Sequence, residues 1–365
     1  MAFMRLAVFA VLFVSAFSVP ALTQSDFESS FCQTTDLYAF YGGPLFDASS
    51  KWGLIDGSGN VVVAPDFQSP PKFSEGLAVT YKDGKTLFLN ELGGIAFRSE
   101  ASEAENFSEG LAAVKIGHLW GFIDKTGKMM IPPRFANVMG SSEGIAAVRP
   151  PGEIYQAIDR SGKVLFAGPN EGSDSFDFFS EGLTEYSGKD GGEGYIDKYG
   201  KWAIPPQFTR AEPFHEGLAA VQQARTSRWG FISRDGAFAI PPIYSHPEPF
   251  SEGLAAVRVA SEKGNPMPFV GFIDKEGHPV IQPQFEGAGN FCGGLAPVSI
   301  GGNMGYVDRA GKVVIPPQFQ DAQSFKGALA SVTIIDQAGK HDAYVDRSGR
   351  VVWLSEGREF MFPTF

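Results

Sequence analysis

The stretch that decides the fold of this chain runs Trp120-Gly121-Phe122-Ile123-Asp124-Lys125-Thr126-Gly127-Lys128-Met129-Met130-Ile131-Pro132-Pro133-Arg134-Phe135. An aromatic residue followed by Gly-Phe-Ile-Asp, and a Gly three residues after the Asp, recur with variations along the chain. The glycines that follow the Asp are spaced 34 to 41 residues apart, at Gly59, Gly93, Gly127, Gly162, Gly200, Gly236, Gly277, Gly311 and Gly349. A period of this length indicates one supersecondary unit in each copy. The sequence therefore predicts nine units in a row.

A second signature, Phe-Ser-Glu-Gly-Leu-Ala-Ala-Val, accompanies the first in most copies. Clear examples, with small variations, are Phe107 to Val114, Phe214 to Val221 and Phe250 to Val257. Together with Trp-Gly-Phe-Ile-Asp and Ile-Pro-Pro-x-Phe, this pattern resembles the bacterial WG (Trp-Gly) repeat family over roughly Phe31 to Trp353. The resemblance implies a β-rich repeat protein. It implies no established activity and no catalytic residues.

Each unit is predicted to be a three-stranded antiparallel β-meander. In the quoted copy, residues 111–115, 120–123 and 128–131 are short runs rich in strand-forming residues. The segment Asp124 to Gly127 between the second and third runs suits a type I turn, with Asp at its first position and Gly in the left-handed position. We therefore interpret the most repeated residues as structural, namely Trp52, Trp120, Trp229, Asp56, Asp124, Asp274, Gly59, Gly127 and Gly277.

The proline pairs carry information on topology. Pro132-Pro133 recurs as Pro205-Pro206, Pro241-Pro242 and Pro316-Pro317. Because proline cannot donate to a strand pairing, it belongs on edge strands or at strand ends. The pairs thus predict that the third strand ends there and forms the edge of a separate small sheet. Adjacent apolar residues such as Phe122 and Ile123 point to opposite faces, so each sheet is expected to pack on both sides.

The array could be open or closed. Propellers typically have four to eight blades of four strands, whereas this sequence predicts nine units of three strands. The chain also begins near a first strand and ends on a third strand, so that no strand is left over to close a ring. We expect an open superhelical stack of sheets, with a closed propeller-like ring as the alternative.

The two cysteines, Cys32 and Cys292, bear on this choice. Cys292 occupies the Ser position of Phe-Ser-Glu-Gly, and Cys32 occupies the same position in a vestigial copy. An exported chain can form disulfides, and a Cys32–Cys292 bridge would require the array to curl back on itself. The alternative is two separately placed thiols.

The first 21 residues are typical of a signal peptide, with Arg5, an apolar run over 6–14 and small residues before a cleavage site near Ala21. An uncleaved membrane anchor is the alternative. We expect a leader with a vestigial repeat over 22–50 and a single-domain repeat array over 51–365, located in the periplasm or secreted. The net charge of −11 argues against a nucleic-acid partner, and no later segment is apolar enough for membrane insertion.

No reactive constellation is recognisable. The sequence contains no nucleophile elbow, phosphate loop or dinucleotide fingerprint, and its five histidines lack metal spacing. We therefore expect no catalytic residues, no metal and no cofactor. The recurring glutamates are interpreted as hydrogen-bonding groups of the connections; they are lost at Gly293 and Gly327, in the last two full copies.

Three functional hypotheses follow. The leading one is an exported non-enzymatic binding or scaffold protein that presents its repeat surface to a protein or a cell-envelope polysaccharide. The second is an enzyme or enzyme inhibitor with its site in the irregular loops over 168–177 or 260–268, and the third is a purely structural envelope component. Trp202 and Trp353 lie outside the aromatic pattern of the repeat and are the candidate ligand-facing aromatics.

Overall fold

The computed structural model describes residues 36–42, 51–168, 176, 178–258, 269–337 and 339–355, called the described residues below. The predicted signal peptide, the leader up to residue 35, and the predicted loop over 260–268 lie outside them, and the loop over 168–177 is described only at Gly168 and Phe176. The described residues form strands and turns and hold no helix that could span a membrane. The predicted all-β class is thus confirmed.

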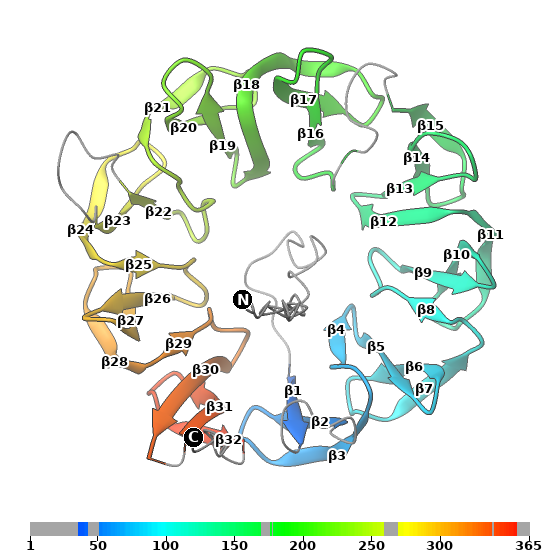
Figure 1. Cartoon of the computed structure of the whole chain (residues 1–365), viewed down its shortest axis with the longest axis horizontal. Helices are drawn as coiled ribbons and strands as arrows, with labels where there is room; N and C mark the ends of the chain where they lie inside the picture. Colours follow the sequence, from blue (N-terminus) through cyan, green and yellow to red (C-terminus); the bar gives the residue numbers. More distant parts are fainter. Residues whose placement is uncertain are drawn as a thin grey trace, which may run out of the picture.

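The strands form eight antiparallel sheets arranged in a ring (Figure 1). The first three sheets are β1 (Leu37–Gly42), β2 (Lys51–Asp56), β3 (Val61–Phe67); β4 (Lys72–Ser74), β5 (Leu77–Lys82), β6 (Lys85–Asn90), β7 (Ile95–Ser99); and β8 (Glu103–Ala104), β9 (Leu111–Ile116), β10 (Leu119–Asp124), β11 (Met129–Phe135). The next two are β12 (Asn137–Ser142), β13 (Ile145–Arg149), β14 (Gln156–Asp159), β15 (Val164–Ala167); and β16 (Leu183–Ser187), β17 (Glu193–Asp197), β18 (Trp202–His215), β19 (Leu218–Gln223), β20 (Trp229–Ile232), β21 (Phe238–Tyr244).

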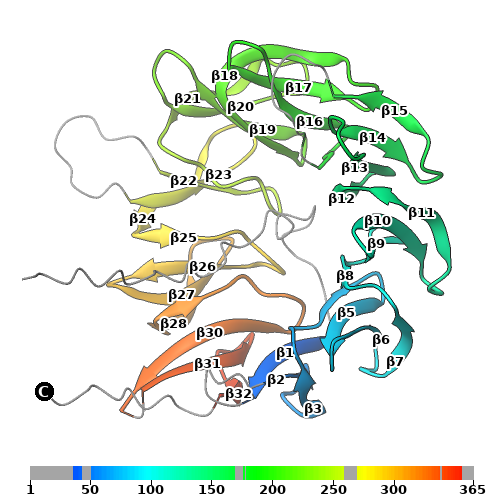
Figure 2. The ribbon, with the colours of Figure 1, turned by 45° about the vertical axis from the view of Figure 1, so that its right-hand side comes forward.

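The last three sheets complete the ring (Figure 2). They are β22 (Ala255–Arg258), β23 (Val270–Ile273), β24 (Pro279–Phe285); β25 (Gly287–Ala288), β26 (Leu295–Ile300), β27 (Asn303–Asp308), β28 (Val313–Phe319); and β29 (Asp321–Ala322), β30 (Leu329–Asp336), β31 (Gly339–Asp346), β32 (Val351–Leu354). The architecture is therefore that of an eight-sheet β-propeller.

The expectation of nine separate three-stranded units is wrong in two respects. The 14-residue strand β18 pairs with β17 through its first half and with β19 through its second half, so two repeats share one six-stranded sheet. In five other sheets the connection contributes an additional strand of two to six residues, which pairs with the strand after it. Both differences arise in the connections, where the repeat pattern is least regular.

The quoted stretch forms β10 and β11 and the turn between them. The Asp124 carboxylate accepts the Thr126 N–H at 2.9 Å and the Lys128 N–H at 3.1 Å, and Gly127 has a φ of +84°. The predicted turn is thus confirmed. Glycine is required in the Trp-Gly pair for a different reason, which is space. A Cβ on Gly121 would lie only 2.5 Å from the Ile131 carbonyl oxygen.

The proline pairs do not end the third strands. Strand β11 continues through Pro132 and Pro133 to Phe135, with register shifts against β10. Because β11 is the edge of its sheet, its prolines have no neighbour to which they would have to donate. The prediction that third strands are edges holds for eight strands, β3, β7, β11, β15, β21, β24, β28 and β32, and fails for β18.

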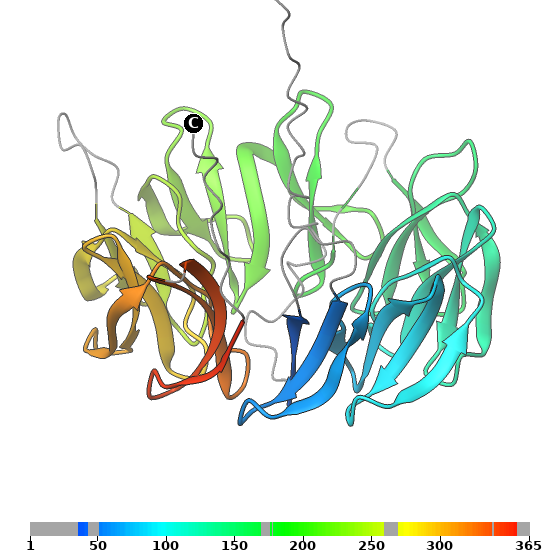
Figure 3. The same cartoon turned by 60° about the horizontal axis from the view of Figure 1, so that its bottom comes forward.

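The ring is closed, which corrects the expected open stack. Figure 3 shows the first and last sheets, blue and red, side by side. The Tyr38 hydroxyl accepts the Ala328 N–H at 2.9 Å and donates to the Lys326 carbonyl at 2.8 Å, while the Tyr344 hydroxyl donates to the Ala39 carbonyl at 2.8 Å. Closure needs no spare strand, because the two sheets meet through side-chain packing.

The core lies between neighbouring sheets. Phe40 packs against Trp353 across the closure, and Phe285 and Phe291 lie in one buried cluster between two sheets. Burial of each of these aromatic side chains removes enough apolar surface from water to stabilise the fold by about 1.5–3 kcal/mol. The aromatic residues of the repeat therefore join one sheet to the next.

Candidate functional site

The recurring glutamates link consecutive repeats. Each lies in a left-handed turn with φ between +51° and +54°, namely Glu75, Glu109, Glu143, Glu181, Glu216 and Glu252. The carboxylate accepts a backbone N–H from the equivalent turn of the next repeat: Glu143 binds Gly182 at 2.7 Å, and Glu252 binds Gly293 at 2.5 Å and Gly294 at 2.9 Å. In Figure 1 the connections leading into β9 and β26 reach toward the centre of the ring.

Four of these six glutamates also pair with a cation from the next repeat. The Glu216 carboxylate lies 3.0 Å from the Gly253 N–H nitrogen and 3.0 Å from the Lys275 Nζ. The other three pairs are Glu75 with Lys125, Glu109 with Arg160, and Glu181 with Arg234. We call the carboxylate, its N–H donor and the cation a carboxylate contact.

The contact of Glu75 explains the electrostatics of this residue. Burial raises the pKa of Glu75, but the Gly110 N–H and the Lys125 ammonium lower it more, so this pKa falls below its ordinary value. A carboxylate held ionised by backbone donors is a structural group, since it has no proton to give and its oxygens are occupied. The interpretation of the glutamates as hydrogen-bonding groups of the connections is confirmed.

The cations are the residues that the sequence analysis missed. Each directly follows the turn Asp, or Ser233 in the case of Arg234, and the four are Lys125, Arg160, Arg234 and Lys275. A basic residue stands at the same position in three further copies, at Lys198, Arg309 and Arg347. The signal was a Lys or Arg in register with the turn glycines, and it was overlooked because a charged turn residue is ordinarily only solvated.

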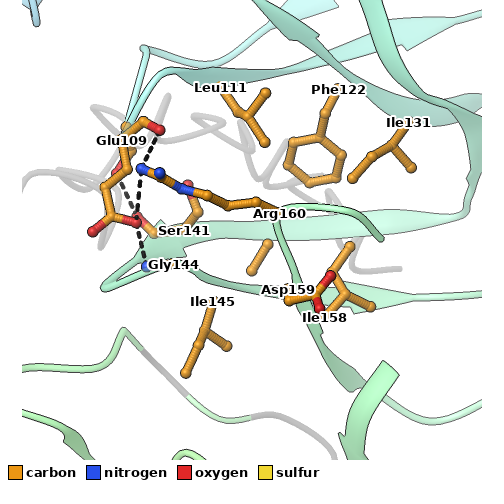
Figure 4. A pocket seen from close by; sticks show the side chains of 12 residues that line it. Glu109, Leu111, Phe122, Ile131, Ser141, Gly144, Ile145, Ile158, Asp159 and Arg160 are labelled. Atoms are coloured by element: carbon orange, nitrogen blue, oxygen red, sulfur yellow. Dashed lines mark hydrogen bonds and ion pairs between the residues drawn. The ribbon is translucent and has the colours of Figure 1, made fainter. Parts of the chain in front are cut away.

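A small cavity lies beside one carboxylate contact (Figure 4). Leu111, Phe122 and Ile131 line it from one sheet, while Ile145 and Ile158 line it from the next. Its volume is about 10 Å³, which leaves room for at most one water molecule. This cavity is a packing gap between two sheets, too small for an organic ligand.

The tryptophans of the repeat are largely structural. Trp120 and Trp229 are buried, and Trp52 is partly buried against the cluster between the first two sheets. Trp353 contacts Phe40 and Tyr344 at centroid distances of 5.1 and 6.0 Å, so this candidate aromatic lies at the ring closure.

Trp202 differs from these residues. It is 38% exposed and its edge meets Tyr186, with 5.8 Å between ring centroids. Tyr199, three residues earlier, is 60% exposed, and Phe238 on β21 of the same six-stranded sheet is 37% exposed. Phe238 holds the strand position in its repeat that Trp202 holds in the preceding one. We call Tyr199, Trp202 and Phe238, as a set of exposed aromatic residues of one sheet, the aromatic surface. The sequence marked only one of the three.

The six-stranded sheet and its neighbour also hold unusual carboxyl groups. Burial raises the pKa of Glu212 and of Glu248, and His246 partly offsets both effects. Glu193 stands at the position that Trp52, Trp120 and Trp229 hold in their copies, and its carboxylate accepts the Ala211 N–H at 2.6 Å. Among the described residues no group of three or more His, Cys, Asp or Glu side chains could hold a metal ion.

The turn aspartates have local partners. Asp56 accepts the Ser58 N–H at 2.8 Å, and Asp274 accepts the His278 N–H at 2.7 Å. The Thr126 hydroxyl and N–H lower the pKa of Asp124. Each carboxylate thus closes its own turn, as the sequence predicted.

Cys292 is buried. The chain has one other cysteine, Cys32, which lies outside the described residues. The Cys32–Cys292 bridge therefore stays a prediction, and mass spectrometry of the non-reduced protein is its test.

Comparison with known protein families shows which family this repeat matches. The WG-containing repeat matches residues 52–85, 90–118, 120–149, 194–224, 229–261, 271–303 and 304–334, which is more than half of the chain. The chain belongs to the WG repeat family. No curated protein matches it.

Solved structures resemble this WG repeat protein. A eukaryotic initiation factor matches with a TM-score of 0.57 and 10% identity over 89% of this chain and 97% of that one. A computationally designed protein, Ika8, matches with a TM-score of 0.41 and 13% identity over 77% and 93% of the two chains. At these identities the likeness to the initiation factor concerns the fold alone, and the likeness to the designed protein carries no argument.

Proposed function

We propose that this WG repeat protein is an exported, non-enzymatic binding or scaffold protein that presents its ring surface to a protein or a cell-envelope glycan. Two features support the proposal. A ring of small sheets builds a long surface from many similar segments. The repeated charged residues of the described part are largely engaged in turns and carboxylate contacts, which leaves recognition to positions where the repeat varies.

The observation that carries the proposal is the aromatic surface. At the position of Trp202 the other third strands mostly carry exposed aliphatic residues such as Val61, Val313 and Val351. Large exposed aromatic rings in place of these are costly to leave in water, and they offer an apolar face together with a polar edge to a sugar ring or a peptide. The six-stranded sheet is therefore the part of the ring that we expect to contact the ligand.

A binding experiment with matched variants tests this assignment. The mature protein and the double variant Tyr199→Ala/Trp202→Ala would be compared on a glycan array and in pull-downs from envelope extract. The control is Val313→Ala/Val351→Ala, which removes exposed apolar residues from equivalent strand positions in other sheets. We expect the aromatic variant alone to lose at least tenfold in retained ligand. The proposal fails if the wild type retains nothing, or if both double variants bind equally.

Export is supported by the signal-peptide pattern over residues 1–21. Cell fractionation of the full-length chain tests it. We expect a mature protein shortened near Ala21 in the periplasm or the medium, and an uncleaved chain in the membrane fraction would favour the anchor alternative.

A further inference from the structure

One carboxylate contact of the ring lacks its carboxylate. Where earlier repeats have Glu-Gly, the repeat before β26 has Gly293-Gly294, yet a later repeat still supplies its cation, Arg347. The Arg347 guanidinium donates to the Gly293 carbonyl at 2.6 Å and to the Gly327 carbonyl at 2.9 Å. Among the described residues no carboxylate lies within ion-pair distance of Arg347.

The other repeats show what this arrangement normally holds. The Lys125 ammonium donates to the Glu75 carbonyl at 2.8 Å and lies 3.2 Å from the same residue's carboxylate. Arg347 makes the equivalent carbonyl contact with Gly293, so the cation is in place and only the carboxylate is missing. An exposed guanidinium has five donors in a fork that matches a carboxylate, and two of the donors are used here.

A backbone donor is available beside the guanidinium. The carboxylates of Glu75 and Glu252 accept the N–H groups of Glu109 and Gly293, and the equivalent N–H of the next copy belongs to Gly327. The Gly327 N–H has no acceptor among the described residues, whereas the neighbouring Ala328 N–H is bound by the Tyr38 hydroxyl. An incoming carboxylate would therefore meet one N–H and one guanidinium.

The surroundings leave room for a peptide. Gly293 is exposed, and no described residue lies within 4 Å of the place where a Cβ of Gly294 would be. The guanidinium lies over the Phe325 ring at 4.9 Å, which supports its plane from below. The backbone of a second chain can therefore approach closely. Gly293 and Gly294 present no side chain on one side, and the guanidinium of Arg347 lies on the other.

We propose that Arg347 and the Gly327 N–H form a binding site for the carboxylate of an acidic peptide segment, such as a Glu side chain of a partner protein. The bound carboxylate would complete the contact as Glu75, Glu109, Glu181 and Glu216 do in their repeats. This site goes beyond the proposed function, because it lies in other sheets than the aromatic surface and is specific for a charged group.

The test uses a peptide copied from the repeat itself. Acetyl-Phe-Ser-Glu-Gly-Leu-amide would be titrated into the ¹⁵N-labelled mature protein, while the Gly327 amide and the Arg347 Nε–H signals are followed by NMR. The same peptide with Gln in place of Glu is the ligand control. We expect saturable shifts with the Glu peptide and at least tenfold weaker binding of the Gln peptide.

Protein variants sharpen the outcome. Arg347→Gln should abolish the shifts of Gly327. Gly293→Glu should do the same by supplying an internal carboxylate, once the tip of the flexible Arg347 side chain moves away from the new Cβ. Lys275→Gln is the matched control, because its contact already contains Glu216, and it should bind as the wild type does. Equal binding of the Gln peptide, unchanged binding by Arg347→Gln, or glucuronate binding as tightly as the Glu peptide would overturn the assignment.

Discussion

Single residues in left-handed turns connect the repeats of this molecule. A Glu at φ near +53° is uncommon, because non-glycine residues pay a steric cost there. The conformation recurs because it aims the carboxylate at the next repeat, where it meets a backbone N–H and usually a cation. The sequence indicated a hydrogen-bonding role for this residue, and the structure identifies its partners in the next repeat.

Glu216→Ala tests the strength of one connector. The substitution removes the acceptor of the Gly253 N–H and the partner of Lys275. A charge-assisted hydrogen bond contributes about 1.5–3 kcal/mol, and solvent at this site reduces that, so we expect a loss of about 1 kcal/mol in the free energy of unfolding. Urea denaturation measures it. Glu216→Gln keeps an acceptor oxygen and should lose less; equal stability of wild type and the Ala variant would refute the role.

Glu248→Gln tests a buried carboxyl group. Burial raises the pKa of Glu248 in the folded chain above its ordinary value, so the ionised form is disfavoured in the fold at neutral pH. This penalty is fully present above the folded pKa and disappears as the pH falls below the unfolded pKa. The variant should therefore have a higher Tm than the wild type at pH 7, by roughly 1–3 °C. Thermal unfolding monitored by circular dichroism at pH 7 and pH 4 should show the advantage shrinking in acid, and a constant difference would contradict the assignment.

At the scale of elements, the turn between the second and third strands of a repeat presses on the third strand of the preceding repeat. A Cβ on Gly349 would lie 2.7 Å from Ile315 Cγ2, and a Cβ on Gly311 would lie 2.9 Å from Ile281 Cγ2. The turn glycines are thus needed for two reasons, a positive φ and a close approach. Only the first reason is visible in the sequence.

A comparison of Gly349→Ala with Gly84→Ala distinguishes the cost of the positive φ from the cost of the close approach. Both glycines have positive φ, at +84° and +71°, but in the described part of the chain nothing lies within 4 Å of a Cβ on Gly84. Gly84→Ala should cost about 1 kcal/mol from backbone strain alone. Gly349→Ala should cost about 1–3 kcal/mol more, because the added methyl group forces the neighbouring sheet to shift. Equal losses in urea denaturation would show that the turns do not clamp the sheets.

The sequence predicted the elements that rest on local chemistry. The turn at Asp124 to Gly127, the strands on either side and the edge position of β11 follow from residue preferences and were predicted. The continuous strand β18 was not, because the Pro205-Pro206 pair suggests a stop and the pairing partner that extends the strand comes from the next repeat. The cations of the carboxylate contacts were missed for the same reason, since their partners lie in another repeat.

At the scale of the whole molecule, closure could not be deduced from the repeat. Whether the first and last of eight sheets meet depends on the small rotation of each sheet relative to the one before it, summed over the whole array. The decisive contacts join residues about 290 positions apart, such as Tyr38 with Lys326 and Ala328. Tyr38 itself has no distinguishing sequence context. The aromatic surface was found only in part, because exposure of Tyr199 and Phe238 depends on which faces the neighbouring sheets cover.

The most direct test of the closed ring is a distance across the closure. Ser58 and Val351 are exposed, and a Cβ on the adjacent Gly59 would touch the Val352 carbonyl oxygen. Spin labels attached through noncanonical residues at these two positions would report their separation by pulsed electron paramagnetic resonance. The closed ring predicts a single distribution below about 25 Å, which allows for the length of two labels and close contact of the sheets. An open stack of eight sheets spaced by about 10 Å would place the labels about 70 Å apart, and a distribution centred there would contradict the ring.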